Sequence, residues 1–411
     1  MSRVVLPVPQ LERLRKIGDL RLEKLLKDGL PVLANVPPDR QTFENLRLRT
    51  DLLPRAIKPD PDKLALAQRL FGDYAAEISG ALLLAALPQS YATEYGAAVL
   101  GAHGELTNNL TRRIGRTAQF LLTVTQSADK AADQSRLWDW RKSAGEKNVD
   151  HLPWAACVQL RIFHQIVREQ LMSDTDPRIK ELLGTHNNPP LNQEDLLGMM
   201  LTFSFAVFEV LEHYGISWTA DEQEAYLHLW DLIGGYLAIG STLVKAELKP
   251  CRVPSTWQGL RPPTIGQSRD LLDQIRARQW LDPTPRANVA ALSWTALRSG
   301  RVLARALLDE LEEGMPPLLK PLPIAVMRAL NTDVVRERLN LGGNGVILQS
   351  LTLLPKREVK IARFTSFQSP NRLAGRVLRT LANEVTARSL VHLVQEFSIT
   401  FPGAPDWHRT P

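Results

Sequence analysis

Apolar residues recur along most of this 411-residue chain at intervals of three and four, the spacing of one helix face, and strand-like alternation is rare. Stretches rich in Pro, Gly and charged residues separate the periodic segments, and none has the length or composition of a free linker. The pattern therefore predicts an all-α protein with a single domain over residues 1–411. The expected helices cover residues 8–29, 62–87, 107–126, 153–172, 192–214, 219–247, 284–313 and 371–398.

The longest apolar run covers residues 196–211 and follows the pair Pro189 and Pro190. Polar residues such as Glu209 interrupt it, and it is shorter than the roughly 20 residues that a membrane span requires. We therefore expect a buried core helix with Asn192 as its N-cap, and no membrane span. The first thirty residues alternate charge and Leu, and they contain no apolar core of the kind that a secretory signal peptide needs.

The overall composition excludes several function classes. Lys and Arg outnumber Asp and Glu by 50 to 44, but the basic residues are scattered and only 6% of the chain is aromatic, so no nucleic-acid partner is expected. Cys157 and Cys251 are the only cysteines, too few for a Cys-based zinc or iron–sulfur site. The sequence also lacks the HExxH, Walker-type, GxSxG and Gly-rich dinucleotide motifs, and the paired Glu-x-x-His units of a di-iron bundle.

The segment from Cys157 to Leu171, CVQLRIFHQIVREQL, carries the most informative residues. Its apolar positions follow helical spacing and place His164 beside a buried face. Arg161 and Arg168 lie three residues before and four residues after His164, so the three side chains share one side of the helix. A haem iron needs a neutral imidazole nitrogen, and cations stabilise the haem propionates, so this helix offers both. The alternative is a core histidine held by a hydrogen bond, with two arginines that reach solvent.

The RIFHQIVR stretch resembles the arginine–histidine–arginine helix of the family that contains the latex-clearing rubber oxygenases and the oxygenase of mycophenolic acid biosynthesis. LNQEDLLGMMLTFSFAVFEVLEHYGI and EAYLHLWDLIGGYLAIG look like the next two helices of that family, and LPQSYATEYGAAVL and LTRRIGRTAQFLLTV look like its distal-side helices. The four blocks keep the family's order across residues 60–330. The resemblance implies a globin-like helical core around a b-type haem, with additional helices, with His164 as the axial ligand of the haem iron and with Arg161 and Arg168 beside the cofactor.

The distal helix of the family carries an arginine, then a lysine and a threonine three and four residues later. Arg113, Arg116 and Thr117 occupy these positions here. The lysine has become Arg116, which stays protonated and is a poor iron ligand, so the resemblance implies an open distal side with Arg116 near the cofactor. Arg113 and Thr117 are candidate catalytic residues, whereas without the resemblance they would be ordinary surface or packing positions on a helix.

The resemblance also implies a catalytic base. The family's glutamate falls here near Ala98, and Glu94, one helical turn earlier, is the candidate that replaces it. The alternative is that Glu94 is an exposed carboxylate without a catalytic role.

The activity that the resemblance implies is cleavage of the double bonds of cis-1,4-polyisoprene (rubber) by O2, which gives oligo-isoprenoids with aldehyde and ketone ends. Two alternatives stay open: a haem oxygenase that acts on a small prenyl or lipid substrate, and a haem-binding protein without catalytic activity. We expect a monomer, because no heptad seam is present. The resemblance implies an extracellular or cell-envelope location, and the lack of a signal peptide in this sequence keeps a cytoplasmic location open.

Overall fold

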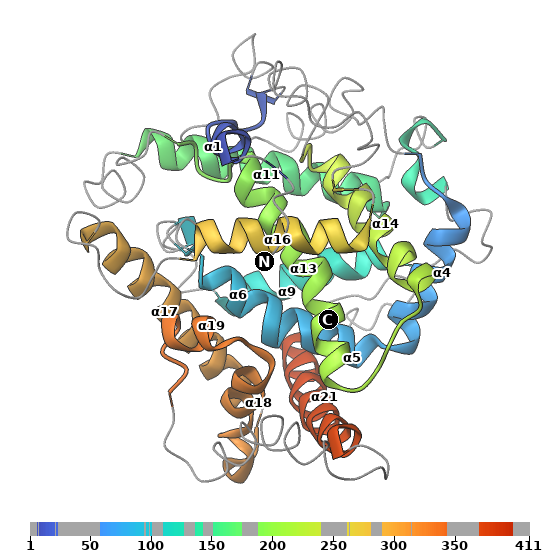
Figure 1. Ribbon diagram of the computed structural model, residues 1–411, viewed down its shortest axis with the longest axis vertical. Coiled ribbons are helices and arrows are strands. Elements are labelled where there is room, and N and C mark those ends of the chain that lie inside the picture. The colour runs from blue at the N-terminus through green and yellow to red at the C-terminus, as the bar shows by residue number, and fades with distance from the viewer. Residues whose placement is uncertain are drawn as a thin grey trace, which may run out of the picture.

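The structure is a computed structural model built from α-helices (Figure 1). It describes residues 6, 8–20, 22–23, 58–93, 96–97, 99–100, 110–126, 136–142, 151–174, 188–239, 261–262, 264–280, 290–313, 315–342 and 370–397. Within these ranges no residue lies in a strand, so the all-α prediction is confirmed.

The helices differ widely in length, and most of the long ones coincide with a predicted segment. In chain order they are α1 (Val8–Arg15), α4 (Pro61–Asp73), α5 (Ala75–Ala81), the π-helical turn η1 (Leu82–Ala86), α6 (Leu87–Tyr91), α9 (Leu110–Thr125), the 3₁₀ turn η2 (Trp140–Lys142), α11 (Pro153–Ser173), α13 (Gln193–His213), α14 (Ala220–Tyr236), α16 (Ile265–Gln279), α17 (Ala290–Glu313), the 3₁₀ turn η3 (Pro317–Leu319), α18 (Leu322–Leu330), α19 (Asp333–Arg338) and α21 (Pro370–Phe397).

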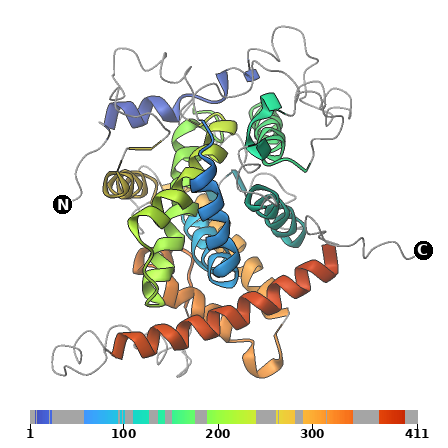
Figure 2. The same cartoon turned by 90° about the vertical axis from the view of Figure 1, so that its right-hand side faces the viewer.

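Helix α13 lies at the centre of the molecule, where α1, α5, α6, α14 and α16 pack against it. It is apolar on nearly every side, and Leu201, Phe205 and Val207 are fully buried, as expected of a core helix. In Figure 2 it runs beside the α5–α6 segment, and α21 passes across one end of the pair. Among the described helices, α13 is long and apolar enough to cross a membrane, and the bent α4–α6 pair passes the same test, but 72% of the apolar window of α13 is buried inside the protein.

The single helix expected over residues 62–87 is wrong, because the chain bends by 89° at Tyr74, between α4 and α5. Tyr74 has φ −122° and ψ 30°, outside the helical region. Its ring centroid lies 5.7 Å from that of Trp218, at the edge of a buried aromatic cluster. Tertiary packing of aromatic rings therefore overrides an apolar pattern that continues through the break.

The same segment extends beyond its predicted end, through the π-helical turn Leu82–Ala86 and past Pro88 to Tyr91. Proline has no N–H, so the carbonyl of Leu84 loses its helical partner. The buried side chain of Asn331 replaces that partner, since its Nδ2 donates to the Leu84 carbonyl at 2.8 Å. The helix can therefore continue for one turn after the proline.

Two other boundaries were predicted wrongly. The helix expected over residues 219–247 ends at Tyr236, where Ala238 adopts a left-handed conformation with φ 59° and the Ile239 N–H donates to the Gly234 carbonyl at 2.9 Å. The helix expected over residues 8–29 is interrupted, because α1 ends at Arg15, residues 17–19 are not helical, and residues 20, 22 and 23 are helical again. Residue 21 and residues 24–29 lie outside the described residues.

Helix α16 was not predicted, because most of its residues are polar and its apolar stripe is narrow. Its start carries a recognisable signal, since the side chain of Thr264 accepts the N–H of Gln267 at 3.2 Å. Leu271 and Ile275 of this stripe are fully buried. Helices α18 and α19 were also not predicted, because they are only nine and six residues long.

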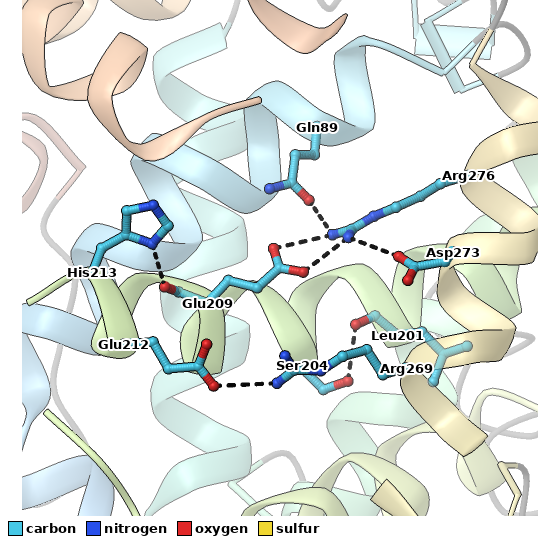
Figure 3. A network of polar contacts seen from close by, with 9 residues as sticks. All are labelled: Gln89, Leu201, Ser204, Glu209, Glu212, His213, Arg269, Asp273 and Arg276. Atoms are coloured by element: carbon cyan, nitrogen blue, oxygen red, sulfur yellow. Dashed lines mark hydrogen bonds and ion pairs between the residues drawn. The ribbon is translucent and has the colours of Figure 1, made fainter. Parts of the chain in front are cut away.

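Arg276 of α16 joins three helices through a polar network (Figure 3). Its Nη1 donates to Glu209 Oε1 of α13 at 2.9 Å and lies 3.7 Å from the carboxylate of Asp273. Its Nη2 donates to the buried Oε1 of Gln89 in α6. The network holds α6, which leads into the segment with Glu94, against the central helix.

Candidate functional site

Helix α11 carries His164 and has one side that the rest of the protein covers only in part. Pro153 starts the helix in its first turn, where a missing N–H costs nothing. Most positions of the helix are buried, but accessible surface remains on one side, at Gln159, Leu160, Phe163 and His164. Phe163 is 46% exposed, a high exposure for an aromatic side chain in the middle of a helix that is mostly buried. This side therefore presents apolar surface around an imidazole.

The imidazole of His164 is neutral at pH 7. Burial and then the charge of Arg168 lower its pKa to about 4, and the carboxylate of Asp19 opposes that shift. No hydrogen bond to the His164 ring is found in the described part of the chain. A neutral ring whose nitrogens are not engaged by protein groups retains a lone pair for a metal ion.

Two other described histidines, His228 and His213, have ring nitrogens within hydrogen-bond distance of backbone groups and so provide a comparison for His164. The pKa of His228 is also lowered by burial to about 4, but its Nε2 accepts the Asp60 N–H at 3.0 Å. His213 Nδ1 lies 2.7 Å from the carbonyl of Glu209, in the last turn of α13. The interpretation of His164 as a core histidine held by a hydrogen bond therefore describes His228 and finds no support at His164.

The chemistry of the available donors indicates what kind of metal group fits. No set of three or more His, Cys, Asp or Glu side chains that could hold a metal ion occurs among the described residues. A haem brings four ring nitrogens of its own and needs one axial nitrogen from the protein, with an apolar surface for the macrocycle. His164 and the apolar side chains beside it, Leu160 and Phe163, fit that requirement.

Arg161 and Arg168 are buried beside His164 and do not reach solvent, with 3% and 2% of their surface exposed. Arg161 Nη2 donates to Asp19 Oδ1 at 2.8 Å, and its Nε donates to the other carboxylate oxygen. Arg168 donates from Nε to the Pro190 carbonyl at 2.9 Å and from Nη2 to the next carbonyl at 2.6 Å. Protein groups thus engage both guanidinium groups, and a role beside the cofactor stays a prediction.

Helix α9, which carries the predicted distal residues, packs against α11. Arg116 is exposed and Thr117 is partly buried. The backbone of Arg113 is helical, whereas its side chain lies outside the described residues. The partly buried Phe120 and Leu121 add apolar surface to the same helix. The structure therefore brings the two predicted helices together, while the roles of the three distal residues stay predictions.

Glu94, the candidate base, and Tyr95 lie outside the described residues, but residues 91–93 before them and residues 96–97 and 99–100 after them are described. Gly300 of α17 approaches the Tyr91 carbonyl so closely that a Cβ there would lie 2.3 Å from that oxygen. After Glu94, Val99 packs against Val167 of α11 in a small apolar cluster. Val99, five residues after Glu94, therefore lies against the helix that carries His164, and the role of Glu94 stays a prediction.

Sequence reasoning missed the contact of Asp19 with α11. A local signal exists for its other role, because Asp19 is a helix N-cap whose Oδ1 accepts the Leu22 N–H at 3.2 Å. Its partner Arg161 is 142 residues away in the chain, so no local pattern predicts the pair.

Asp195, at the start of α13, is a half-buried acid four residues after Leu191, whose carbonyl accepts a hydrogen bond from Arg168. Burial raises its pKa to about 7, and Arg15 opposes the shift. Its carboxylate accepts hydrogen bonds from Asn192 Nδ2 at 2.7 Å and from Gln279 Nε2 at 3.2 Å. Because the pKa in the folded protein lies above the ordinary value of 3.8, the folded state holds a proton that the unfolded chain loses at lower pH.

We therefore expect Asp195→Asn to remove a pH-dependent loss of stability. Between pH 4 and pH 7, the free energy of unfolding of the wild type should fall as pH rises, by up to about 1.4 kcal/mol per pH unit from this group. The variant lacks the carboxyl group, so this fall should be absent from its pH profile. Urea unfolding at several pH values measures the difference, and the exposed position Asp221 provides the control Asp221→Asn. Parallel pH profiles for Asp195→Asn and the wild type would contradict the expectation.

The model of the catalytic domain of "ER-bound oxygenase mpaB/B'/Rubber oxygenase" matches residues 69–351, more than half of the chain. The chain belongs to this oxygenase family. Helices α9 and α11 and the segment around Glu94 lie inside the matched region, so every candidate site residue falls within the mpaB/rubber oxygenase catalytic domain.

One solved structure of the same group is a more distant match. It is the structure of latex clearing protein LCP in the closed state, which is 17% identical in sequence, with a TM-score of 0.47. The match covers 91% of this chain and 88% of that chain. No curated protein matches the chain. Membership of the mpaB/rubber oxygenase family confirms the resemblance and identifies the protein as a member of a family of oxygenases.

Proposed function

We propose that this oxygenase binds a b-type haem through His164 and uses O2 to cleave the double bonds of cis-1,4-polyisoprene. The observation that carries the proposal is the partly uncovered side of α11, where a neutral imidazole without a described hydrogen bond stands among apolar side chains. Family membership supports the use of O2 and an isoprenoid-type substrate.

The residues of this chain would contribute binding, orientation and proton transfer. A bound haem would supply the binding and activation of O2. His164 would hold the cofactor by one ring nitrogen, and the apolar side chains of Leu160 and Phe163 would pack beside it and exclude water. Glu94 would take an allylic proton from the bound isoprenoid, and Arg113 and Thr117 would orient the reacting groups on the distal side.

An apolar polymer is the substrate that we favour over a small prenyl compound. Helix α9, which packs against α11, carries further partly buried apolar side chains at Ala118, Phe120, Leu121 and Leu122, which supports an apolar substrate such as an extended isoprenoid. A long polyisoprene chain does not cross a membrane, so we also propose that the enzyme acts outside the cell or at the cell envelope.

The test is spectroscopic first and enzymatic second. We expect a purified protein with a Soret band and a b-type pyridine haemochrome, and O2 uptake in the presence of polyisoprene latex with formation of aldehyde and ketone groups. Uptake on soluble prenyl alcohols without activity on latex would favour the small-substrate alternative. A protein that binds haem but consumes no O2 on either substrate would leave a haem-binding protein without catalytic activity. A protein that stays colourless after haem is added would contradict the proposal.

A further inference from the structure

Residues 17–19 form a short turn between α1 and the helical residues 20, 22 and 23, and this turn lies outside the matched catalytic domain but packs on helix α11. The start of α13 holds this turn from one side, because Gln193 N–H donates to the Ile17 carbonyl at 2.9 Å. The Gln193 Nε2 donates to the next carbonyl, that of Gly18, at 3.0 Å. The turn is therefore fixed to the central helix, although it lies about fifty residues before the matched region begins at residue 69.

From this turn, Asp19 reaches Arg161 of α11. The two side chains are 6% and 3% exposed, and they form a two-point pair: Nη2 with Oδ1 at 2.8 Å and Nε with Oδ2. The Leu22 N–H donates to the same carboxylate at 3.2 Å. A guanidinium bound at two points fixes direction as well as distance, so this pair restrains the rotation of α11 about its own axis.

The turn also touches α11 on the other side of His164. A Cβ added at Gly18 would lie 3.0 Å from Nε of Arg168, so the glycine backbone approaches that arginine closely. Arg161 precedes His164 by one helical turn and Arg168 follows it by one. Residues 18 and 19 therefore hold α11 at two points that flank the histidine.

Asp19 also supplies the negative charge for this region. Burial raises its pKa, but the charge and the hydrogen bonds of Arg161 outweigh burial and hold the pKa below its ordinary value. The carboxylate is thus ionised at neutral pH and balances one of the two buried arginine charges. Removal of the Asp19 carboxylate takes away a buried countercharge and two hydrogen bonds of Arg161, which weakens the restraint on its helix.

We infer that Asp19 is a positioning residue for His164, which acts through Arg161 to set the rotation of α11 and the direction of the imidazole. The inference rests on the proposed function, and it makes the segment before the catalytic domain a part of the cofactor site. Groups that orient a metal-binding histidine commonly change metal affinity by 10- to 100-fold when they are removed.

The test compares Asp19→Asn with the wild type in the full chain. We expect haem loss to excess apomyoglobin to be faster on the order of 10-fold or more in the variant, with altered g-values in the spectrum of the ferric protein. Amide hydrogen exchange in the haem-free proteins should be faster around residues 161–168. The control is Arg15→Gln, which removes another ion pair of the N-terminal segment, the 2.8 Å pair with Glu194. Glu194 belongs to α13, not to α11, and it keeps a second ion pair with Arg278 at 2.9 Å. This control should match the wild type.

Arg161→Lys serves as a second variant if Asp19→Asn folds poorly, because it keeps the charge and replaces the two-point pair by a single contact. Its haem loss should lie between those of the wild type and Asp19→Asn. A folded Asp19→Asn with wild-type haem loss, g-values and exchange in α11 would overturn the inference and leave the proposed function intact. A wild type that binds no haem would instead overturn the proposed function, and unchanged exchange in α11 would then also refute the positioning role.

Discussion

Replacement of His164 by alanine is expected to give a folded, colourless protein without oxygenase activity. The reason is that no other described side chain on the uncovered side of α11 has a nitrogen lone pair to offer, since the nitrogen of Gln159 belongs to an amide. The absorbance ratio of the Soret band to the protein band after desalting measures haem retention. Circular dichroism of the same sample reports whether the helices are intact.

Imidazole in the buffer provides the sharper readout for this variant. The alanine leaves a space of the size of the missing ring, so added imidazole should restore haem binding to His164→Ala if the residue acts as a ligand. An unfolded variant would not respond. The matched control is His213→Ala, at an exposed position in the last turn of α13, which should retain haem fully. A His164→Ala protein that is red and active without imidazole would refute the assignment of the axial ligand.

Apolar periodicity predicts much of this fold because it records which side of each helix is buried. It located α9, α11, α13 and α21 within a few residues, since each of these helices has a broad apolar face. It failed at Tyr74 and at Pro88, where distant residues decide the outcome: Trp218 packs against the bend, and Asn331 satisfies the carbonyl that the proline leaves free. A local pattern holds no record of such partners.

The candidate site also has features that local spacing predicts and contacts that it does not. The positions of His164, Arg161 and Arg168 on one helix follow from their spacing, and the structure confirms that the three residues lie together. The sequence did not predict that Asp19 and the backbone at Pro190 engage the two arginines, because these contacts join segments that are far apart in the chain or follow an irregular turn. Spacing and the family resemblance together made His164 the candidate ligand, which stays a prediction, but neither indicated the groups that contact the arginines beside it.

Replacement of Arg168 by methionine should lower the free energy of unfolding of the haem-free protein by about 3 kcal/mol, because it leaves buried acceptors without donors. Arg168 is 2% exposed and donates to Gln165 and to the carbonyls of Pro190 and Leu191. Leu191 has φ 52°, a left-handed conformation that a leucine rarely adopts, so the arginine also holds a strained turn between α11 and α13. Methionine fills much of the same volume, so the change reports on hydrogen bonds more than on packing.

Urea unfolding of the haem-free protein measures this effect, with Arg305→Met as the control. Arg305 is 56% exposed and pairs with Asp309 on the surface of α17, so its loss should cost no more than about 1 kcal/mol. The family resemblance places Arg168 beside the cofactor, and the same variant separates the two roles. If the haem-free Arg168→Met protein is as stable as the haem-free wild type, but the haem-bound variant loses haem faster than the haem-bound wild type, the arginine serves the cofactor. The structural role is then refuted. If stability falls, and haem loss changes no more than the weakened turn explains, then Arg168 stabilises the connection that keeps α11 and its histidine in register with the central helix.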